Sequence, residues 1–160
     1  MKDLVDIAEQ IAAQLMARKQ TIAVAESSTG GPIAAALLAV PGASAYFKGG
    51  AVVYTREARR LLMDIPDEAM KGIRSASEPY AKLLAEQMRR RFETDWSLSE
   101  TGATGPTGNR YGDAAGHSCM AVAGAATKVI TLETGSSDRA GNMQTFAKTA
   151  LELLLKELLQ

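Results

Sequence analysis

The chain has 160 residues, with 18 Lys plus Arg balanced by 18 Asp plus Glu, so its formal net charge is zero. Hydrophobic residues make up 46% and charged residues 22%, which is typical of one globular domain with its own core and excludes a disordered chain. Because the charges balance, nothing in the composition predicts attraction to nucleic acid or to an anionic membrane surface.

Cysteine and histidine usage excludes several kinds of site. The single cysteine, Cys119, excludes an internal disulfide and favours a reducing compartment. One cysteine and one histidine, His117, are too few for a Cys/His zinc site, and we expect neither a metal nor a cofactor. Residues 1–10 are amphipathic and acidic, unlike a signal peptide, and no apolar run is long enough to span a bilayer. These features predict a cytoplasmic protein with no membrane partner.

The chain opens with an amphipathic pattern. Residues 3–18 place apolar side chains at helical spacing, which predicts a helix with a packing role. Ile22 to Ala25 is then a short apolar run, residues 26–31 are rich in hydroxyls and glycine, and Pro32 to Val40 is apolar and rich in alanine. This order predicts a strand, a loop and a helix.

The turn at residues 26–31 is the first candidate site. In open α/β sheets ligands bind beyond the carboxyl ends of the strands, and a helix N-terminus favours anions. The turn offers one carboxylate, three hydroxyls and two glycines: Glu26, Ser27, Ser28, Thr29, Gly30 and Gly31. The alternative is a capped helix start with Ser28 or Thr29 as the N-cap, and the residues alone leave the two open.

A second strand and two short helices follow. Ala45 to Tyr54 predicts a strand interrupted at Gly49 and Gly50, where we expect a bulge or a close backbone contact. Arg56 to Met63 predicts a short helix whose three arginines we interpret as a solvated face, and residues 66–70 predict another short helix.

The middle of the chain predicts a long helix and a strand. Residues 75–79 introduce a helix over 80–92, whose final arginines complement the helix dipole. Residues 95–100 alternate as a strand does, and residues 101–108 form a second glycine-rich loop. We interpret this loop as a binding loop because binding residues concentrate in loops that follow strands; a flexible surface loop is the alternative.

The last third predicts a hairpin and a helix. Residues 118–124 and 128–133 predict two paired strands, and residues 144–159 predict a final amphipathic helix, with Asp138 as a capping residue before it. We interpret the lone His117 as structural. The order of elements predicts a single three-layer α/β/α domain.

Four motifs occur in order along the chain: ESSTGG, PGASAYFKGGAVVYTREAR, SASEP and TGATGPTG. Together they resemble the C-terminal domain of the competence/damage-inducible protein CinA. The resemblance implies one domain over residues 1–160, with a mixed, mostly parallel sheet, and a homo-oligomer. Characterised members of that family are nicotinamide-mononucleotide deamidases, which hydrolyse the nicotinamide carboxamide to nicotinate mononucleotide and ammonia. The implied partner is therefore a small nucleotide substrate, and the implied mechanism is a serine/lysine amidohydrolase without a metal.

The resemblance assigns roles to particular residues. The family's ESCTGG motif is residues 26–31 here, so Ser27 inherits the nucleophile and Ser28 stands where cysteine is usual. The family's Y-S-N-E-x-K segment is residues 54–59, so Tyr54 and Arg59 inherit catalytic positions, and Arg59 replaces the family lysine. The residues that inherit substrate contacts are Glu26, Ser28, Thr29, Gly30, Gly31, Thr101, Gly102, Gly105, Arg110 and Arg139.

Two further departures concern the phosphate. Residues 113–116, Asp-Ala-Ala-Gly, stand where the family has Lys-Pro-Val-Gly, and Arg110 is the nearby basic residue that could replace that lysine. Arg139 matches the family's Gly-Asp-Arg segment, and an arginine fork matches a phosphate bidentately. The alternative for Arg139 is a surface ion pair.

Arginine at position 59 alters the expected chemistry. A serine hydroxyl needs a nearby base, and lysine can serve when burial lowers its pKa, whereas a guanidinium stays protonated. Losing a general base typically costs about 10²–10⁴-fold in rate. The remaining candidate bases are Glu26, Lys48 and Tyr54. Backbone N–H groups around residues 29–31 or in the 101–108 loop are the candidate oxyanion donors.

Three functions follow from these patterns. The first is an amidohydrolase acting on nicotinamide mononucleotide or a related amide. The second is a nucleotide-binding or regulatory paralogue without turnover, which the change at Arg59 and the altered residues 113–116 favour. The third is an assembly domain whose glycine loops serve packing.

Overall fold

A computed structural model describes all residues from 1 to 160. Its centre is a five-stranded sheet in the order β2-β1-β3-β4-β5. The strands are β1 (Ile22–Glu26), β2 (Phe47–Val52), β3 (Trp96–Ala103), β4 (His117–Ala123) and β5 (Thr127–Glu133). β1 pairs in parallel with β2 and β3, while β4 pairs antiparallel with β3 and β5. Only β4 therefore runs against the other strands, which confirms a mixed sheet with most strands in one direction.

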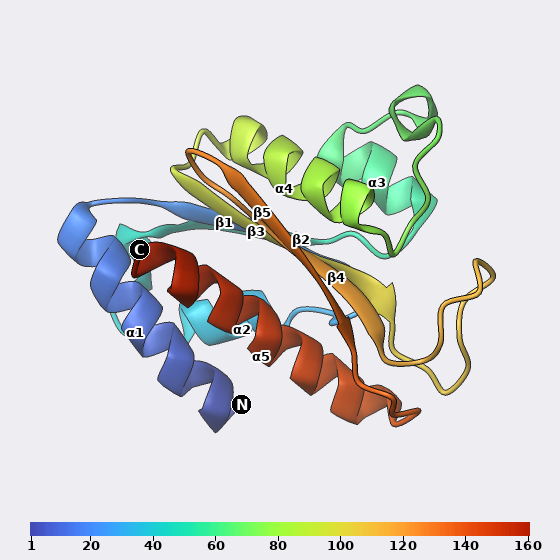
Figure 1. The fold of residues 1–160 in the computed structure, drawn as a ribbon. Helices are drawn as coiled ribbons and strands as arrows, with labels where there is room; N and C mark the ends of the chain where they lie inside the picture. Colours follow the sequence, from blue (N-terminus) through green and yellow to red (C-terminus); the bar gives the residue numbers. More distant parts are fainter.

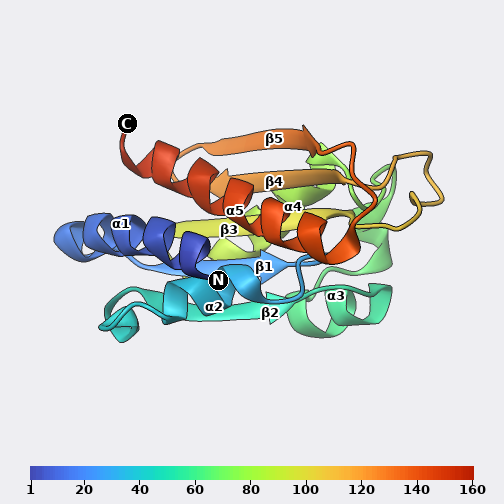
Figure 2. The same cartoon turned by 90° about the horizontal axis from the view of Figure 1, so that it is seen from below.

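Helices cover both faces of the sheet, as Figures 1 and 2 show. One face carries α1 (Lys2–Arg18), α2 (Pro32–Leu38) and α5 (Arg139–Leu158), and the other carries α3 (Arg56–Met63) and α4 (Glu78–Phe92). Two 3₁₀ turns, η1 (Ala43–Ala45) and η2 (Asp67–Met70), complete the elements. The predicted three-layer α/β/α domain is confirmed. None of the helices combines the length and the hydropathy that a membrane span requires.

The core divides between the two faces because strand side chains alternate. Ile22 and Val24 of β1 belong to the larger cluster under α1, α2 and α5, while Ala23 and Ala25 face the cluster under α3 and α4. On the α4 side the sheet presents small residues, and Ser99 donates a hydrogen bond of 2.6 Å to a backbone carbonyl of α4. Because these side chains are small, α4 lies close to the sheet. Residues next to α4 form the floor of the site described below.

Some predicted boundaries move. Residues 101–103 continue β3 and pair with β4, so the predicted loop at 101–108 was wrong at its start. β2 begins at Phe47 rather than at Ala45, and α5 begins at Arg139 rather than at residue 144. The predicted irregularity in β2 is confirmed, because Ile22 pairs with Phe47 and Ala23 with Gly49, which leaves one residue of β2 extra.

Candidate functional site

A cavity of about 470 Å³ lies where β1, β2 and β3 end. It is bounded by the residues that follow β1 and β2, by α3 and η2, by residues 73–76, and by residues 109–111. Six of the residues predicted to form the site line it: Ser27, Tyr54, Arg59, Thr101, Gly102 and Arg110. The fold thus gathers into one cavity side chains that are far apart in the sequence.

The other predicted site residues do not line this cavity. They are Glu26, Ser28, Thr29, Gly30, Gly31, Gly105 and Arg139. The turn residues among them do not line the cavity because two buried carboxylates accept hydrogen bonds from them. The polar groups that the sequence predicted for a ligand are therefore bound within the protein.

Glu26 caps α2. Its Oε1 accepts the backbone N–H groups of Gly31 and Ile33 at 3.2 and 3.0 Å, and its Oε2 accepts that of Ala34 at 2.8 Å. The prediction of Ser28 or Thr29 as N-cap was wrong, since the N-cap position is Gly31, whose φ of 124° suits glycine. Burial raises the pKa of Glu26, although these hydrogen bonds oppose the rise. A carboxylate used in this way is a helix cap and not a base aimed at the cavity.

Glu100 holds the rest of the turn. Its Oε2 accepts the backbone N–H groups of Ser27 and Thr29 at 3.1 and 3.0 Å. Its Oε1 accepts the hydroxyl of Ser28, in a short contact, and that of Ser118 at 3.2 Å. Sequence reasoning missed this residue, because an acidic residue at the end of an alternating strand resembles a solvent-facing position. Its full burial is set by tertiary packing.

The predicted oxyanion donors of the turn are already engaged. The N–H of Thr29 donates to Glu100, that of Gly30 to the Ser27 carbonyl at 3.3 Å, and that of Gly31 to Glu26. In this conformation these three groups cannot hold an oxyanion, so that expectation was wrong for the turn. The Ser27 hydroxyl itself makes no hydrogen bond within the protein and lines the cavity.

Arg59 is buried, which contradicts the interpretation of the α3 arginines as a solvated face at this position. Its side chain is 10% exposed, and Nη2 lies 3.3 Å from Oδ1 of Asp67. Arg56, which is exposed, holds the same carboxylate in a fork, and this hydrogen bond lowers the pKa of Asp67. The Arg59 guanidinium also lies over the ring of Tyr80, 5.9 Å from its centre.

Tyr54 lies at the rim of the cavity and contacts Arg139. Nη2 of Arg139 is 3.4 Å from the Tyr54 hydroxyl, and its Nη1 donates to the carbonyl of Gly105 at 2.5 Å. Arg139 therefore ties the loop after β3 to Tyr54 instead of lining the cavity. Of the three candidate bases, only Tyr54 lines the cavity; Lys48 is the exposed extra residue of the β2 bulge.

Glycine at 102 and threonine at 101 have packing roles. A Cβ on Gly102 would lie 2.5 Å from the carbonyl oxygen of His117, so only glycine fits against β4. The Thr101 hydroxyl accepts the backbone N–H of Ala76 at 3.1 Å. Both residues line the cavity, but their identities are explained by contacts within the protein.

The far wall of the cavity is aromatic and cationic. The centre of the Tyr111 ring lies close to two guanidinium groups, 5.2 Å from that of Arg74 and 5.0 Å from that of Arg110. Nη2 of Arg110 lies 3.0 Å from the Tyr111 hydroxyl, and this hydrogen bond lowers the pKa of Tyr111. Arg110 has no carboxylate partner, which leaves its charge free to meet an anionic ligand.

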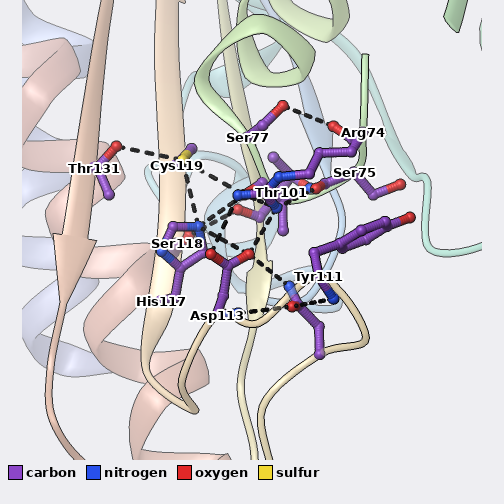
Figure 3. Close-up of polar contacts among 12 residues, drawn as sticks. Arg74, Ser75, Ser77, Thr101, Tyr111, Asp113, His117, Ser118, Cys119 and Thr131 are labelled. Carbon is purple, nitrogen blue, oxygen red and sulfur yellow. Dashed lines mark hydrogen bonds and ion pairs between the residues drawn. The ribbon is translucent and has the colours of Figure 1, made fainter. Parts of the chain in front are cut away.

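Behind this wall a charged network joins residues 74–77 to β4 (Figure 3). Asp113 holds Arg74 in a fork with contacts of 2.7 and 3.2 Å and lies 3.6 Å from Nε2 of His117. The two ring nitrogens of His117 contact the Ala76 carbonyl at 2.7 Å and Glu133 at 2.5 Å. Asp113, in the region where the resemblance places a lysine, thus holds Arg74 in position beside Tyr111. His117 is integrated in the structure, as predicted.

Comparisons with known proteins agree with this arrangement. The family model described as the CinA C-terminal domain matches residues 4–158. A CinA-like protein of Gloeobacter violaceus is 36% identical over 155 residues, covering 96% of this chain and 36% of that protein. A CinA-like protein of Synechococcus sp. (strain CC9902) is 43% identical over 105 residues, covering 66% of this chain and 25% of that protein. The chain therefore spans about a third or less of the length of these relatives.

Solved structures share the fold. The competence/damage inducible protein CihA from Agrobacterium tumefaciens superposes with a TM-score of 0.90 at 27% identity, covering 99% of this chain and 96% of that one. The competence damage-inducible protein A (ComA) from Klebsiella pneumoniae gives a TM-score of 0.92 at 25% identity, covering 98% of each chain.

Proposed function

The chain belongs to the CinA C-terminal domain family, and on this premise we propose that it is an amidohydrolase whose substrate is nicotinamide mononucleotide or a closely related amide. Ser27 is the proposed nucleophile, and Tyr54 and Arg59 line the same cavity. The cavity residues Arg110 and Tyr111 are the proposed contacts of the phosphate end. We also propose a cytoplasmic homo-oligomer, to be tested by light scattering of the purified chain.

One observation carries this proposal. Ser27 follows β1, whereas Tyr54 and Arg59 belong to residues 54–59 after β2, and all three line one cavity at the carboxyl ends of the strands. Ligands bind at this edge in open α/β sheets. The Ser27 hydroxyl has no hydrogen-bond partner within the protein, so no internal contact holds it away from a ligand in the cavity.

The reaction needs four changes at the amide. The Ser27 oxygen bonds to the carboxamide carbon, and the hydroxyl proton moves to an acceptor. The candidate acceptor within the cavity is the Tyr54 oxygen, which takes this proton only as the phenolate. The C–N bond then breaks, and the nitrogen leaves as ammonia after taking up that proton. Water finally hydrolyses the acyl-serine, which yields the carboxylate and restores Ser27. Arg59 supplies positive charge for the oxyanion that forms in each half of the reaction.

A second candidate is a nucleotide-binding paralogue without turnover. The observation that favours it is the environment of Arg59. This guanidinium stands at the position of the family's lysine and donates a hydrogen bond to Asp67, so it does not act as a base. Neither of the two carboxylates that hold the turn, Glu26 and Glu100, is available as a base, because both already accept several hydrogen bonds within the protein.

Ammonia release from nicotinamide mononucleotide by the purified protein tests the proposal. We expect turnover that Ser27→Ala abolishes and that Ser44→Ala, an exposed serine outside the cavity, leaves unchanged. Arg59→Lys is the third variant. Turnover only in Arg59→Lys would indicate a pocket that has lost its base, and silence in every variant with ligand binding intact would establish the binding paralogue.

A further inference from the structure

The charge on Arg59 is only partly balanced by the protein. Its one carboxylate contact joins Nη2 to Asp67 over 3.3 Å. Arg56 holds the same carboxylate more closely, through Nε at 3.2 Å and Nη2 at 2.7 Å. Two guanidinium groups thus share one carboxylate, and the buried one has the weaker contact.

One nitrogen of Arg59, Nε, also lacks a hydrogen-bond acceptor. Its Nε is buried with no partner, and it is the one such side-chain nitrogen or oxygen in the structure. A buried donor without an acceptor is unfavourable, and more so on a charged group. The Tyr80 ring offers only a cation–π contact at 5.9 Å. An anion in the cavity would supply both the missing charge and an acceptor, given a small adjustment of the side chain.

We infer that this cavity binds a carboxylate at Arg59, and that it therefore binds the acid form of a pyridine mononucleotide more tightly than the amide form. The inference rests on the proposed function, because that function places the reacting end of the ligand beside Ser27, in the same cavity as Arg59. A guanidinium matches a planar carboxylate bidentately, whereas the lysine of the family is a point charge.

The amide and the acid are a matched pair of probes. The carboxamide is neutral and offers one oxygen acceptor, while the carboxylate offers two oxygens and a negative charge. The ring, the ribose and the phosphate are common to both ligands, so their contributions to affinity cancel in the comparison. Any preference for the acid therefore reports on the residues around the reacting group.

Calorimetric titration of the Ser27→Ala chain with nicotinate mononucleotide and with nicotinamide mononucleotide tests the inference without interference from turnover. We expect the acid to bind at least about tenfold more tightly than the amide. Arg59→Gln in the same background should abolish the preference. Arg60→Gln, on the same helix but exposed and outside the cavity, should keep it.

Asp67→Asn provides a result that misfolding cannot imitate. In this proposal Asp67 competes with the ligand for Arg59, and because its side chain is 54% exposed we expect the fold to tolerate the change. We expect this variant to bind the acid more tightly than the parent does, while affinity for the amide changes less.

Equal affinities for acid and amide, a preference that survives Arg59→Gln, or no binding of either ligand would each overturn the inference. The ammonia assay is independent of these outcomes. A chain that prefers the acid but releases no ammonia refutes the amidohydrolase and keeps the inference, and a chain that releases ammonia but has no preference does the reverse.

Discussion

The carboxylate of Glu100 accepts the backbone N–H of Ser27 over 3.1 Å, although 73 positions separate the two residues in the sequence. This contact fixes the proposed nucleophile to the neighbouring strand. The same carboxylate accepts the N–H and the hydroxyl of Thr29, both at 3.0 Å. The conformation of the turn therefore depends on one buried carboxylate within β3.

Replacing this carboxylate should destabilise the fold. Glu100→Gln keeps the size of the side chain but turns an NH₂ group toward donors that need acceptors. We expect the free energy of unfolding in urea to fall by about 1–3 kcal/mol, the range for leaving a buried donor without its acceptor. Glu152→Gln, exposed on α5, is the matched control and should change little. An unchanged stability in Glu100→Gln would mean that the turn is held by other contacts.

His117 should make stability depend on pH. Burial opposes its protonation, but the hydrogen bonds to Glu133 and to the Ala76 carbonyl, together with the charge of Asp113, outweigh burial and raise the pKa of His117 above 6.5. Because the folded pKa exceeds the unfolded one, the stabilisation is fully present below about pH 6.5 and is lost as pH rises through the folded pKa. Urea titrations from pH 6 to 9 should show this decline.

Two variants isolate the contribution of His117. His117→Gln should remove this part of the pH dependence, and Glu133→Gln should shift the decline to lower pH, because it removes the carboxylate that Nδ1 contacts and leaves a neutral amide. If the wild type and His117→Gln have parallel pH profiles, the histidine titrates alike in the folded and unfolded chains and the interpretation of the network is wrong.

A substitution at Gly102 distinguishes a packing role from a ligand-binding role for this residue. Gly102→Ala places a methyl group 2.5 Å from the His117 carbonyl and 2.8 Å from the Ser118 Cβ, so β3 and β4 must move apart. We expect a loss of about 1–3 kcal/mol in the free energy of unfolding, the range for overpacking. If the variant were as stable as the parent but failed to bind nucleotide, the glycine would be required for the ligand instead.

The sequence predicted the elements better than the contacts. Hydrophobic periodicity predicted a helix over residues 3–18, and α1 spans Lys2–Arg18, since local spacing decides where a helix forms. It could not reveal that Arg59 is buried, because the burial comes from the packing of α4 and η2 against α3. The polar residues of the turn are evident in the sequence, but Glu26 was predicted to contact a ligand whereas it caps α2. Which partner a polar side chain binds depends on how far it reaches in the folded structure.

The two candidate phosphate residues should behave differently. Arg110 lines the cavity without a carboxylate partner, whereas Arg139 holds the Gly105 carbonyl and the Tyr54 hydroxyl. In the Ser27→Ala background we expect Arg110→Gln to weaken binding of nicotinamide mononucleotide about tenfold or more and to leave nicotinamide riboside, which lacks the phosphate, unchanged. Arg139→Gln should affect both ligands equally, because it acts by positioning Tyr54. Calorimetry with both ligands distinguishes these roles. A loss confined to the phosphorylated ligand in Arg139→Gln would show that Arg139 leaves its internal partners to bind the phosphate, as the sequence resemblance implied.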